Sequence, residues 1–434
     1  MRSRVRSIVC VAATAALLAV LSSAPASSQS GAAPPGTRAV AAGGLSAERL
    51  SRIDPWLQQY VDEGRIAGAV ALVLRDGQPV YERAVGWSDR EAGRRMTPDV
   101  IFRIASQSKA ITSTAILMLL EEGRIGLGDR VSRFIPAYGK TTVAVTKEDG
   151  AVETVPARRE ITIRDLLTHT AGISYGTNPQ VAALYREKGL GPEAGFGWYT
   201  ADKDEPICDT MARLASLPFV AQPGESWIYG YNTDILGCVV ERASGMPLDR
   251  FIETRITGPL GMRDTHFFLP LDKRDRLAAV YASGADGKAV RAPDGGRGQG
   301  AYVDGPRKSF AGGAGLLSTA RDYARFLEMV RLGGALGNVR LLAPRTVRLM
   351  TTNQIGTLYP TPGLGWSLAF ETTERWGGSS MDAPGGFGWG GAYGSIYRVD
   401  PDSRLTLVLM IQLMPNATDI RTRFPNMVYQ ALLD

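Results

Sequence analysis

The sequence predicts an α/β (α+β) protein in which one antiparallel sheet, flanked by helices, is built from both ends of the chain. Strand-like runs fall in two clusters that support this prediction, one within residues 68–87 and the other within residues 366–411. Between them, residues 131–268 read mainly as helices and loops, which predicts an inserted helical region. The run from Ala110 to Leu120 is apolar nearly all round, which is typical of a helix buried between layers.

The composition is that of a globular protein. Of the 434 residues, 44% are hydrophobic and 21% are charged, and the 50 glycines and 25 prolines predict many loops and turns. No basic stripe is interleaved with aromatic residues, so we do not expect nucleic acid as a partner. His169 and His266 are the only histidines, which makes a histidine-rich metal site unexpected, and we expect neither a metal nor a cofactor.

Residues 1–26 have the pattern of a signal peptide, with three arginines, an apolar core at residues 8–21 and a small-residue cleavage site at Ala24-Pro25-Ala26. The apolar core is 14 residues long, which is short for a membrane span, although a retained anchor is the alternative. Residues 27–43 read as a flexible linker rich in Ser, Gly, Ala and Pro. We therefore expect an exported protein, periplasmic or secreted, with no membrane span in its mature part.

Removal of this segment takes away three arginines and no acids, so the formal charge falls from +6 to +3. Two cysteines remain, Cys208 and Cys238. In an oxidising compartment they could pair, whereas their apolar helical surroundings equally suit buried free thiols. Both states stay open.

The rest of the chain, residues 44–434, is expected to form one domain. A first helix is expected after Ser46, a good N-cap residue. The runs 68–74 and 79–87 flank Asp76-Gly77, and Asp-Gly between two such runs is a strong hairpin signal.

The sheet part is expected at about residues 44–125 and 310–434, and the helical part at about residues 126–309. The helical part contains one strand-like excursion at residues 141–155, and a glycine-rich stretch at residues 283–305 predicts exposed loop. The last elements expected are strands and a final helix, at residues 366–370, 394–399, 405–411 and 421–433.

Ser106 and Lys109 stand three residues apart where the buried helix is expected to open, which brings both side chains onto one helix face. An alcohol needs a nearby base to become a nucleophile at neutral pH. A lysine is ordinarily protonated there, so burial and the positive end of the helix dipole would have to weaken its hold on the proton. Taken alone, the pair also fits a polar first helical turn.

Tyr229 lies in a short loop between Pro223-Gly224 and a helix-like run that starts at Thr233. With a cationic lysine beside it, this tyrosine could lose its proton more easily and act as a base. The alternative is that Tyr229 or Tyr231 is a packed aromatic residue.

Residues 385–394 contain glycine at high density, around Trp389-Gly390-Gly391. Such a segment lets a substrate approach the backbone of a strand closely and leaves an N–H group free to bind an oxyanion. A glycine-rich hairpin corner is the alternative.

Together, Ser106, Lys109, Tyr229 and Trp389-Gly390-Gly391 resemble the serine β-lactamase/penicillin-binding-protein superfamily, with the closest likeness to the class C β-lactamase-like enzymes called family VIII carboxylesterases. Other stretches in the same order share this resemblance: 89–93, 96–106, 166–172, 259–264 and 312–316. The resemblance implies the β-lactamase/transpeptidase-like fold. It also implies that Ser106 becomes acylated, while Lys109 and Tyr229 share the proton and later activate water. The oxyanion would lie between the backbone N–H groups of Ser106 and Ala392.

Two departures bear on the substrate. Penicillin-recognising members usually carry Tyr-x-Asn, but Tyr231 stands at the third position here and Asn232 follows it. Those members also carry a Lys-Thr-Gly-type triplet, in whose place this chain has Trp389-Gly390-Gly391. We expect Trp389, Gly390, Gly391 and Tyr231 to contact a substrate, and a tryptophan in place of the lysine favours neutral esters.

A rival interpretation starts from Gly172-Ile173-Ser174-Tyr175-Gly176, which matches the Gly-x-Ser-x-Gly pattern of an α/β-hydrolase. It requires a strand, a turn and a helix around Ser174, with His266 and either Asp234 or Asp249 as partners. His169 is expected instead to brace a loop beneath the active site.

We therefore predict a serine hydrolase, most simply a carboxylesterase for short-chain esters with a small-molecule ester or amide as its partner. A class C-like β-lactamase, a D-amino-acid peptidase or an acyltransferase would use the same residues. A non-catalytic penicillin-binding-like sensor is the remote alternative.

Overall fold

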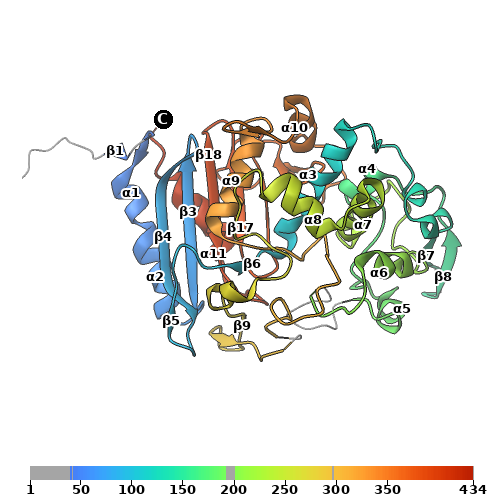
Figure 1. Ribbon diagram of the computed structural model, residues 1–434, viewed down its shortest axis with the longest axis horizontal. Helices are drawn as coiled ribbons and strands as arrows, with labels where there is room; N and C mark the ends of the chain where they lie inside the picture. Colours follow the sequence, from blue (N-terminus) through green and yellow to red (C-terminus); the bar gives the residue numbers. More distant parts are fainter. Residues whose placement is uncertain (1–39, 42, 192–200, 296–297, 434) are drawn as a thin grey trace, which may run out of the picture. The chain divides into compact units, whose positions relative to one another are not determined.

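The computed structural model describes residues 40–41, 43–191, 201–295 and 298–433 (Figure 1). The predicted signal peptide and most of the predicted linker lie outside the described residues. Within the described residues, no helix is both long and apolar enough to cross a membrane.

An eight-stranded antiparallel sheet forms the centre of the fold, in the order β14-β15-β16-β17-β18-β3-β4-β5 (Figure 1). Its strands are β3 (Gly68–Arg75), β4 (Gln78–Asp89), β5 (Arg94–Arg95), β14 (Leu364–Trp366), β15 (Glu371–Thr373), β16 (Phe387–Gly390), β17 (Ile396–Asp400) and β18 (Leu405–Met410). The two ends of the chain meet where β18 pairs with β3, with Leu405 opposite Arg75 and Met410 opposite Val70. The predicted sheet, built from both ends of the chain, is confirmed.

Two-stranded pairings lie around this sheet. They are β1 (Val40–Ala41) with β2 (Leu45–Ser46), β6 (Phe102–Arg103) with β11 (Leu317–Ser318), β7 (Thr142–Thr146) with β8 (Val152–Pro156), β9 (Tyr281–Ser283) with β10 (Ala289–Arg291), and β12 (Ala335–Leu336) with β13 (Val339–Arg340).

Helices cover both faces of the sheet. The α-helices are α1 (Ala47–Ser51), α2 (Ile53–Asp62), α3 (Ser108–Glu121), α4 (Ile163–Leu167), α5 (Ala182–Glu187), α6 (Ile207–Leu214), α7 (Asn232–Ser244), α8 (Leu248–Ile252), α9 (Ala320–Arg331), α10 (Pro344–Thr351) and α11 (Ile420–Tyr429). Shorter turns are the 3-10 helices η1 (Ala105–Gln107), η2 (Val131–Arg133), η3 (Pro136–Gly139) and η6 (Leu271–Arg276), and the π-helical turn η5 (Glu253–Thr257).

Alternate residues of β3 belong to two different cores, as expected of a strand buried on both faces. Ala69, Ala71 and Val73 pack with the apolar residues of α2 and α11. Val70, Leu72 and Leu74 pack with those of α3 and α9. The second of these cores continues into the helical part, where a disulfide between Cys208 and Cys238 joins α6 to α7.

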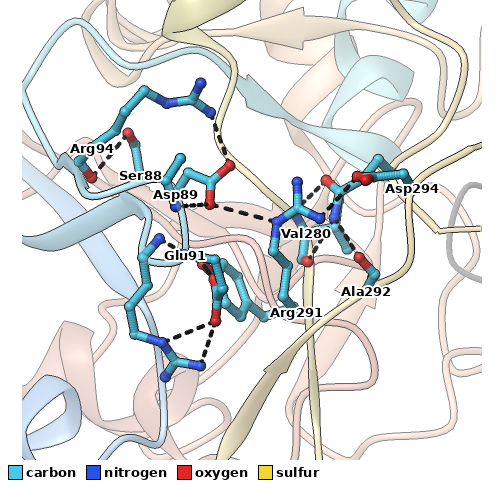
Figure 2. A network of polar contacts seen from close by, with 12 residues as sticks. Ser88, Asp89, Glu91, Arg94, Val280, Arg291, Ala292 and Asp294 are labelled. Atoms are coloured by element: carbon cyan, nitrogen blue, oxygen red, sulfur yellow. Dashed lines mark hydrogen bonds and ion pairs between the residues drawn. The ribbon is translucent and has the colours of Figure 1, made fainter.

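The segment 89–93 forms the turn between β4 and β5. The buried Asp89 accepts a hydrogen bond from the N–H of Ala92 at 3.2 Å and one from Arg94 at 3.1 Å. Arg291, which ends β10, lies 3.5 Å from the same carboxylate (Figure 2). The carboxylate of Asp89 therefore ties the sheet edge to the β9–β10 hairpin.

Three local predictions differ from the structure. Of residues 366–370, expected as a strand, Trp366 ends β14 and residues 367–370 form the turn to β15, because Ser367 Oγ accepts the N–H groups of Ala369 and Phe370. The stretch 283–305, expected as loop, begins within the β9–β10 hairpin. The helix expected to open at Ser106 is preceded by η1 and begins at Ser108.

Candidate active site

Ser106 lies in η1, between β6 and the buried helix α3, and is partly exposed. The residue before it, Ala105, has φ = +43°, a conformation that is costly for any residue other than glycine. The surrounding chain holds it there, because the N–H of Ile104 donates to the carbonyl of Leu316 and Ser108 Oγ accepts the N–H of Leu316. Such strain is concentrated at functional sites, and here it lies directly before Ser106.

Lys109 lies beneath Ser106 and is 2% exposed. Its Nζ is 2.7 Å from the carbonyl oxygen of Gly313, 2.9 Å from the hydroxyl of Tyr175 and 3.4 Å from Ser106 Oγ. An ammonium group has three donors, and these three acceptors match them. The lysine is therefore fixed next to the serine.

The backbone around the carbonyl of Gly313, which accepts a hydrogen bond from Lys109, is fixed by two further hydrogen bonds. The N–H of Gly313 donates to Asp234 Oδ1 at 3.0 Å, and Thr112 Oγ1 donates to the neighbouring carbonyl of Gly312 at 2.9 Å. The glycine-rich motif at 312–316 thus lies against α3 and supports the lysine.

Tyr229 presents its ring to the lysine, with Lys109 Nζ 4.7 Å from the ring centroid. Its hydroxyl accepts a hydrogen bond from Nε1–H of Trp389 at 3.0 Å. The ring of Trp227 stacks on it at 5.7 Å, so the phenol is held on both sides. Trp389 is more than the apolar wall expected from the sequence, because its indole N–H contacts the proposed base.

A cavity of about 230 Å³ opens above these groups. Six of the predicted residues line it: Ser106, Tyr229, Trp389, Gly390, Gly391 and Ala392. A Cβ at Gly391 would lie 2.6 Å from the carbonyl oxygen of Ile104, so a glycine is needed for the end of β16 to approach the segment that precedes Ser106. The two predicted oxyanion donors, the backbones of Ser106 and Ala392, therefore border one cavity.

Tyr231 is not brought to this cavity. Its side chain is fully buried, its hydroxyl accepts the N–H of Gly191 at 2.9 Å, and its ring packs against Tyr175 and Tyr185. The neighbouring Asn232 is also buried and donates from Nδ2 toward His169 Nδ1 at 2.9 Å.

Tyr175 is a site residue that the sequence analysis did not find. It lines the cavity and accepts the hydrogen bond from Lys109, while burial, followed by the neighbouring Tyr229, raises the pKa of its phenol well above the usual value. It therefore stays protonated at neutral pH. In the sequence, Tyr175 stands in the stretch that follows 166–172, next to Ser174 of the rival Gly-x-Ser-x-Gly motif.

The α/β-hydrolase interpretation is not supported. Residues 171–176 form a loop rather than a strand, a turn and a helix, and Ser174 Oγ accepts the N–H of Gly176 at 3.0 Å.

His169 lies behind Tyr229, with ring centroids 4.8 Å apart, and is 1% exposed. Burial, and then the charge of Lys109, lower the pKa of His169 well below its usual value. A neutral imidazole therefore packs against the ring of Tyr229, and its role as a brace for a loop beneath the active site stays a prediction.

A serine next to a buried lysine, with a tyrosine across the same cavity, defines a serine hydrolase. The chain belongs to the Beta-lactamase family, whose model matches residues 53–432. It is 34% identical over 382 residues to Esterase EstB of Burkholderia gladioli, an alignment that covers 84% of this chain and 91% of the esterase.

Other relatives extend this comparison. The chain is 29% identical over 388 residues to a putative D-alanyl-D-alanine carboxypeptidase of Escherichia coli K12, covering 85% of this chain and 83% of the relative. Among solved structures, it is similar to EstCE1, a hydrolase with promiscuous acyltransferase activity, with a TM-score of 0.74 and 28% identity. That match covers 89% of this chain and 99% of EstCE1, and it confirms the predicted β-lactamase/transpeptidase-like fold.

Proposed function

We propose that this protein is a carboxylesterase that cleaves short-chain esters through an acyl-enzyme on Ser106. The observation that carries the proposal is Trp389, which stands on β16 at the cavity wall and donates to the hydroxyl of Tyr229. In penicillin-recognising enzymes that this sequence resembles, a lysine stands at this place. The similarity to Esterase EstB and EstCE1 supports the same assignment.

The reaction starts when Ser106 Oγ attacks the ester carbonyl and its proton passes to Lys109 or Tyr229. The carbonyl oxygen becomes an oxyanion, which the N–H groups of Ser106 and Ala392 stabilise. When the C–O bond breaks, the alcohol leaves with a proton returned from the Lys109–Tyr229 pair. Water then attacks the acyl-serine, giving its proton to the same pair, and releases the acid and the free serine.

The test compares three substrates: 4-nitrophenyl butyrate, a chromogenic cephalosporin and a D-alanyl peptide. We expect ester turnover by the wild type and a loss of about 10³-fold or more in kcat for Ser106→Ala. Ser174→Ala is the matched control and keeps the activity. Labelling with a fluorophosphonate probe should occur at Ser106. Cephalosporin turnover without ester turnover would overturn the substrate assignment, and an unlabelled Ser106 would overturn the mechanism.

D-peptide hydrolysis or acyl transfer is the second candidate. The E. coli relative is named a putative D-alanyl-D-alanine carboxypeptidase, and EstCE1 is described with promiscuous acyltransferase activity. The peptide arm of the assay tests the first, and product analysis with an added alcohol acceptor tests the second.

Export to the periplasm or the medium is part of the proposal. The signal-like residues 1–26 support it, and so does the Cys208–Cys238 disulfide, since disulfides persist in oxidising compartments. Fractionation of cells that express the chain with and without residues 1–26 tests this, and retention of both forms in the cytoplasm would contradict it.

A further inference from the structure

Arg421 is a charged residue in the wall of the cavity that contains Ser106. It lies in the first turn of α11, near the C-terminus, and its side chain reaches the cavity beside Gly390. A Cβ at Gly390 would collide with Nη2 of Arg421. The absence of a side chain on β16 at this position therefore makes room for the guanidinium.

The acids near Arg421 are paired with other groups. Asp419 binds Arg423 at 2.7 Å, Arg65 at 3.1 Å and the hydroxyl of Tyr60 at 2.6 Å. Arg398, on β17, pairs with Glu371 on β15 at 2.7 Å and lies 3.5 Å from Asp382.

Arg421 itself has neither a hydrogen bond nor an ion pair with any of the residues that the structure describes. It is only partly exposed, and burial together with the nearby Arg398 lowers the pKa of its guanidinium from the usual value. An arginine keeps its charge even so.

Helix stability does not explain this placement. A positive side chain in the first turn of a helix opposes the helix dipole, so Arg421 is electrostatically unfavourable for α11. A guanidinium that is partly withdrawn from water without a counter-ion also costs free energy. Both costs fall when an anion enters the cavity and accepts its hydrogen bonds.

We propose that Arg421 is an anion-binding residue of the active site, and that the preferred substrate is a short-chain ester with a carboxylate on its acyl or its alcohol half. This inference rests on the proposed esterase function and revises the expectation of neutral esters, because Arg421 brings to the cavity wall a positive charge that Trp389 does not supply. The fork of a guanidinium fits a carboxylate through two parallel hydrogen bonds, which gives both affinity and orientation. It would place the charge of the substrate beside β16 while Ser106 attacks the ester carbonyl in the same cavity.

The experiment uses matched pairs of esters. For the acyl half, kcat/KM is measured for 4-nitrophenyl hemiglutarate and 4-nitrophenyl pentanoate. For the alcohol half, it is measured for 3-carboxyphenyl butyrate and phenyl butyrate. The readout is the ratio of charged to neutral ester within each pair, and comparison of this ratio between proteins cancels the intrinsic reactivity of the esters.

We expect Arg421→Ala to lower this ratio in one pair by about tenfold or more, the loss of one charge-assisted interaction. Arg421→Lys should retain part of the preference. The matched control is Arg423→Ala, on the same helix but largely exposed and paired with Asp419, which should keep the wild-type ratio. Circular dichroism and Tm verify that each variant is folded.

An unchanged ratio in both pairs for folded Arg421→Ala overturns this inference and leaves the esterase proposal intact. A loss of the same size in Arg423→Ala also overturns it, because the effect would then be general. Absence of Ser106-dependent turnover of every ester by the wild type overturns the esterase proposal and this inference with it.

Discussion

The two sides of the cavity use their polar groups in different ways. On the side of α3, Lys109 is buried and each of its donors has an acceptor. Gly313, whose carbonyl is one of these acceptors, donates its own N–H to Asp234. On the side of β16, the wall is formed by an indole, by glycine backbone and by Arg421, whose charge has no partner among the described residues. A network in which every polar group is hydrogen-bonded holds one geometry, which suits catalytic groups that keep the same positions whatever the substrate. An unsatisfied charge is suited to a ligand, so the second side carries the selection of the substrate.

The largest effect is expected from breaking the α3 side with Lys109→Met, which keeps the length of the side chain and removes its donors. The kcat for an ester should fall by about 10³-fold, since in the proposed mechanism Lys109 is one of the two groups that take the proton of the serine. The hydroxyl of Tyr175 and the carbonyl of Gly313 also lose a buried donor, so the free energy of unfolding should fall by about 1–3 kcal/mol. Steady-state kinetics and urea unfolding measure the two effects.

Lys147→Met is the control for this variant. Lys147 is half-exposed, and its only ion pair among the described residues is with Glu153 at 2.8 Å, on the β7–β8 hairpin. Both kcat and stability should stay close to those of the wild type. Ester turnover by Lys109→Met at the wild-type rate would show that another group takes the proton.

A smaller effect is expected on the β16 side from Trp389→Phe. The ring remains as a wall, but the hydroxyl of Tyr229 loses the Nε1–H donor at 3.0 Å, which in the proposed mechanism would stabilise negative charge developing on that oxygen. We expect kcat to fall by about tenfold with little change in KM, the value of one hydrogen bond to a charged group. In a Tyr229→Phe background the same substitution should cost nothing further, and an equal loss in both backgrounds would show that the indole acts only through packing.

The two sides also differ in how far the sequence predicts them. Ser106 and Lys109 are three residues apart, and such a spacing makes the side chains neighbours across the consecutive helical turns of η1 and α3. The sheet was equally predictable, because Asp76-Gly77 between two strand-like runs specifies a hairpin locally. Tyr229 and the glycine segment needed the family resemblance as well as their own residues.

The site residues that the sequence did not predict depend on contacts between residues far apart in the chain. Tyr175 meets Lys109 across 66 positions of the chain, and nothing in its own neighbourhood signals that contact. Arg421 belongs to the cavity only because Gly390 leaves room for it, which no pattern within α11 shows. Tyr231 was expected at the cavity because it stands at the third position of the Tyr-x-Asn motif that penicillin-recognising members carry. The chain turns into α7 at Tyr231, with φ = −65° and ψ = 6°, and its ring lies among buried aromatic side chains.

The smallest effect is a pH dependence of stability that comes from the α3 side. The pKa of His169 is lowered well below its unfolded value of about 6.5, so below that pH the unfolded chain binds a proton that the native protein does not. The free energy of unfolding is therefore highest above pH 6.5, and this histidine lowers it by up to about 1.4 kcal/mol per pH unit below that value, until its native pKa is reached. His266, whose pKa is lowered to about 4 by burial and by Lys273, adds a slope of the same sign between pH 6.5 and 4.

Urea unfolding of the wild type and His169→Gln at pH 7.5, 6.5 and 5.5 separates the two histidines. Glutamine can still accept the hydrogen bond from Asn232 but does not titrate. The free energy of unfolding of the variant should therefore fall less steeply as the pH is lowered, and the remaining fall should be the part that His266 contributes. An identical slope in both proteins would mean that His169 gains its proton in the native state. In that case the imidazole behind Tyr229 would carry a charge at mildly acidic pH, and the network on the α3 side would be less isolated from the solvent than its buried contacts indicate.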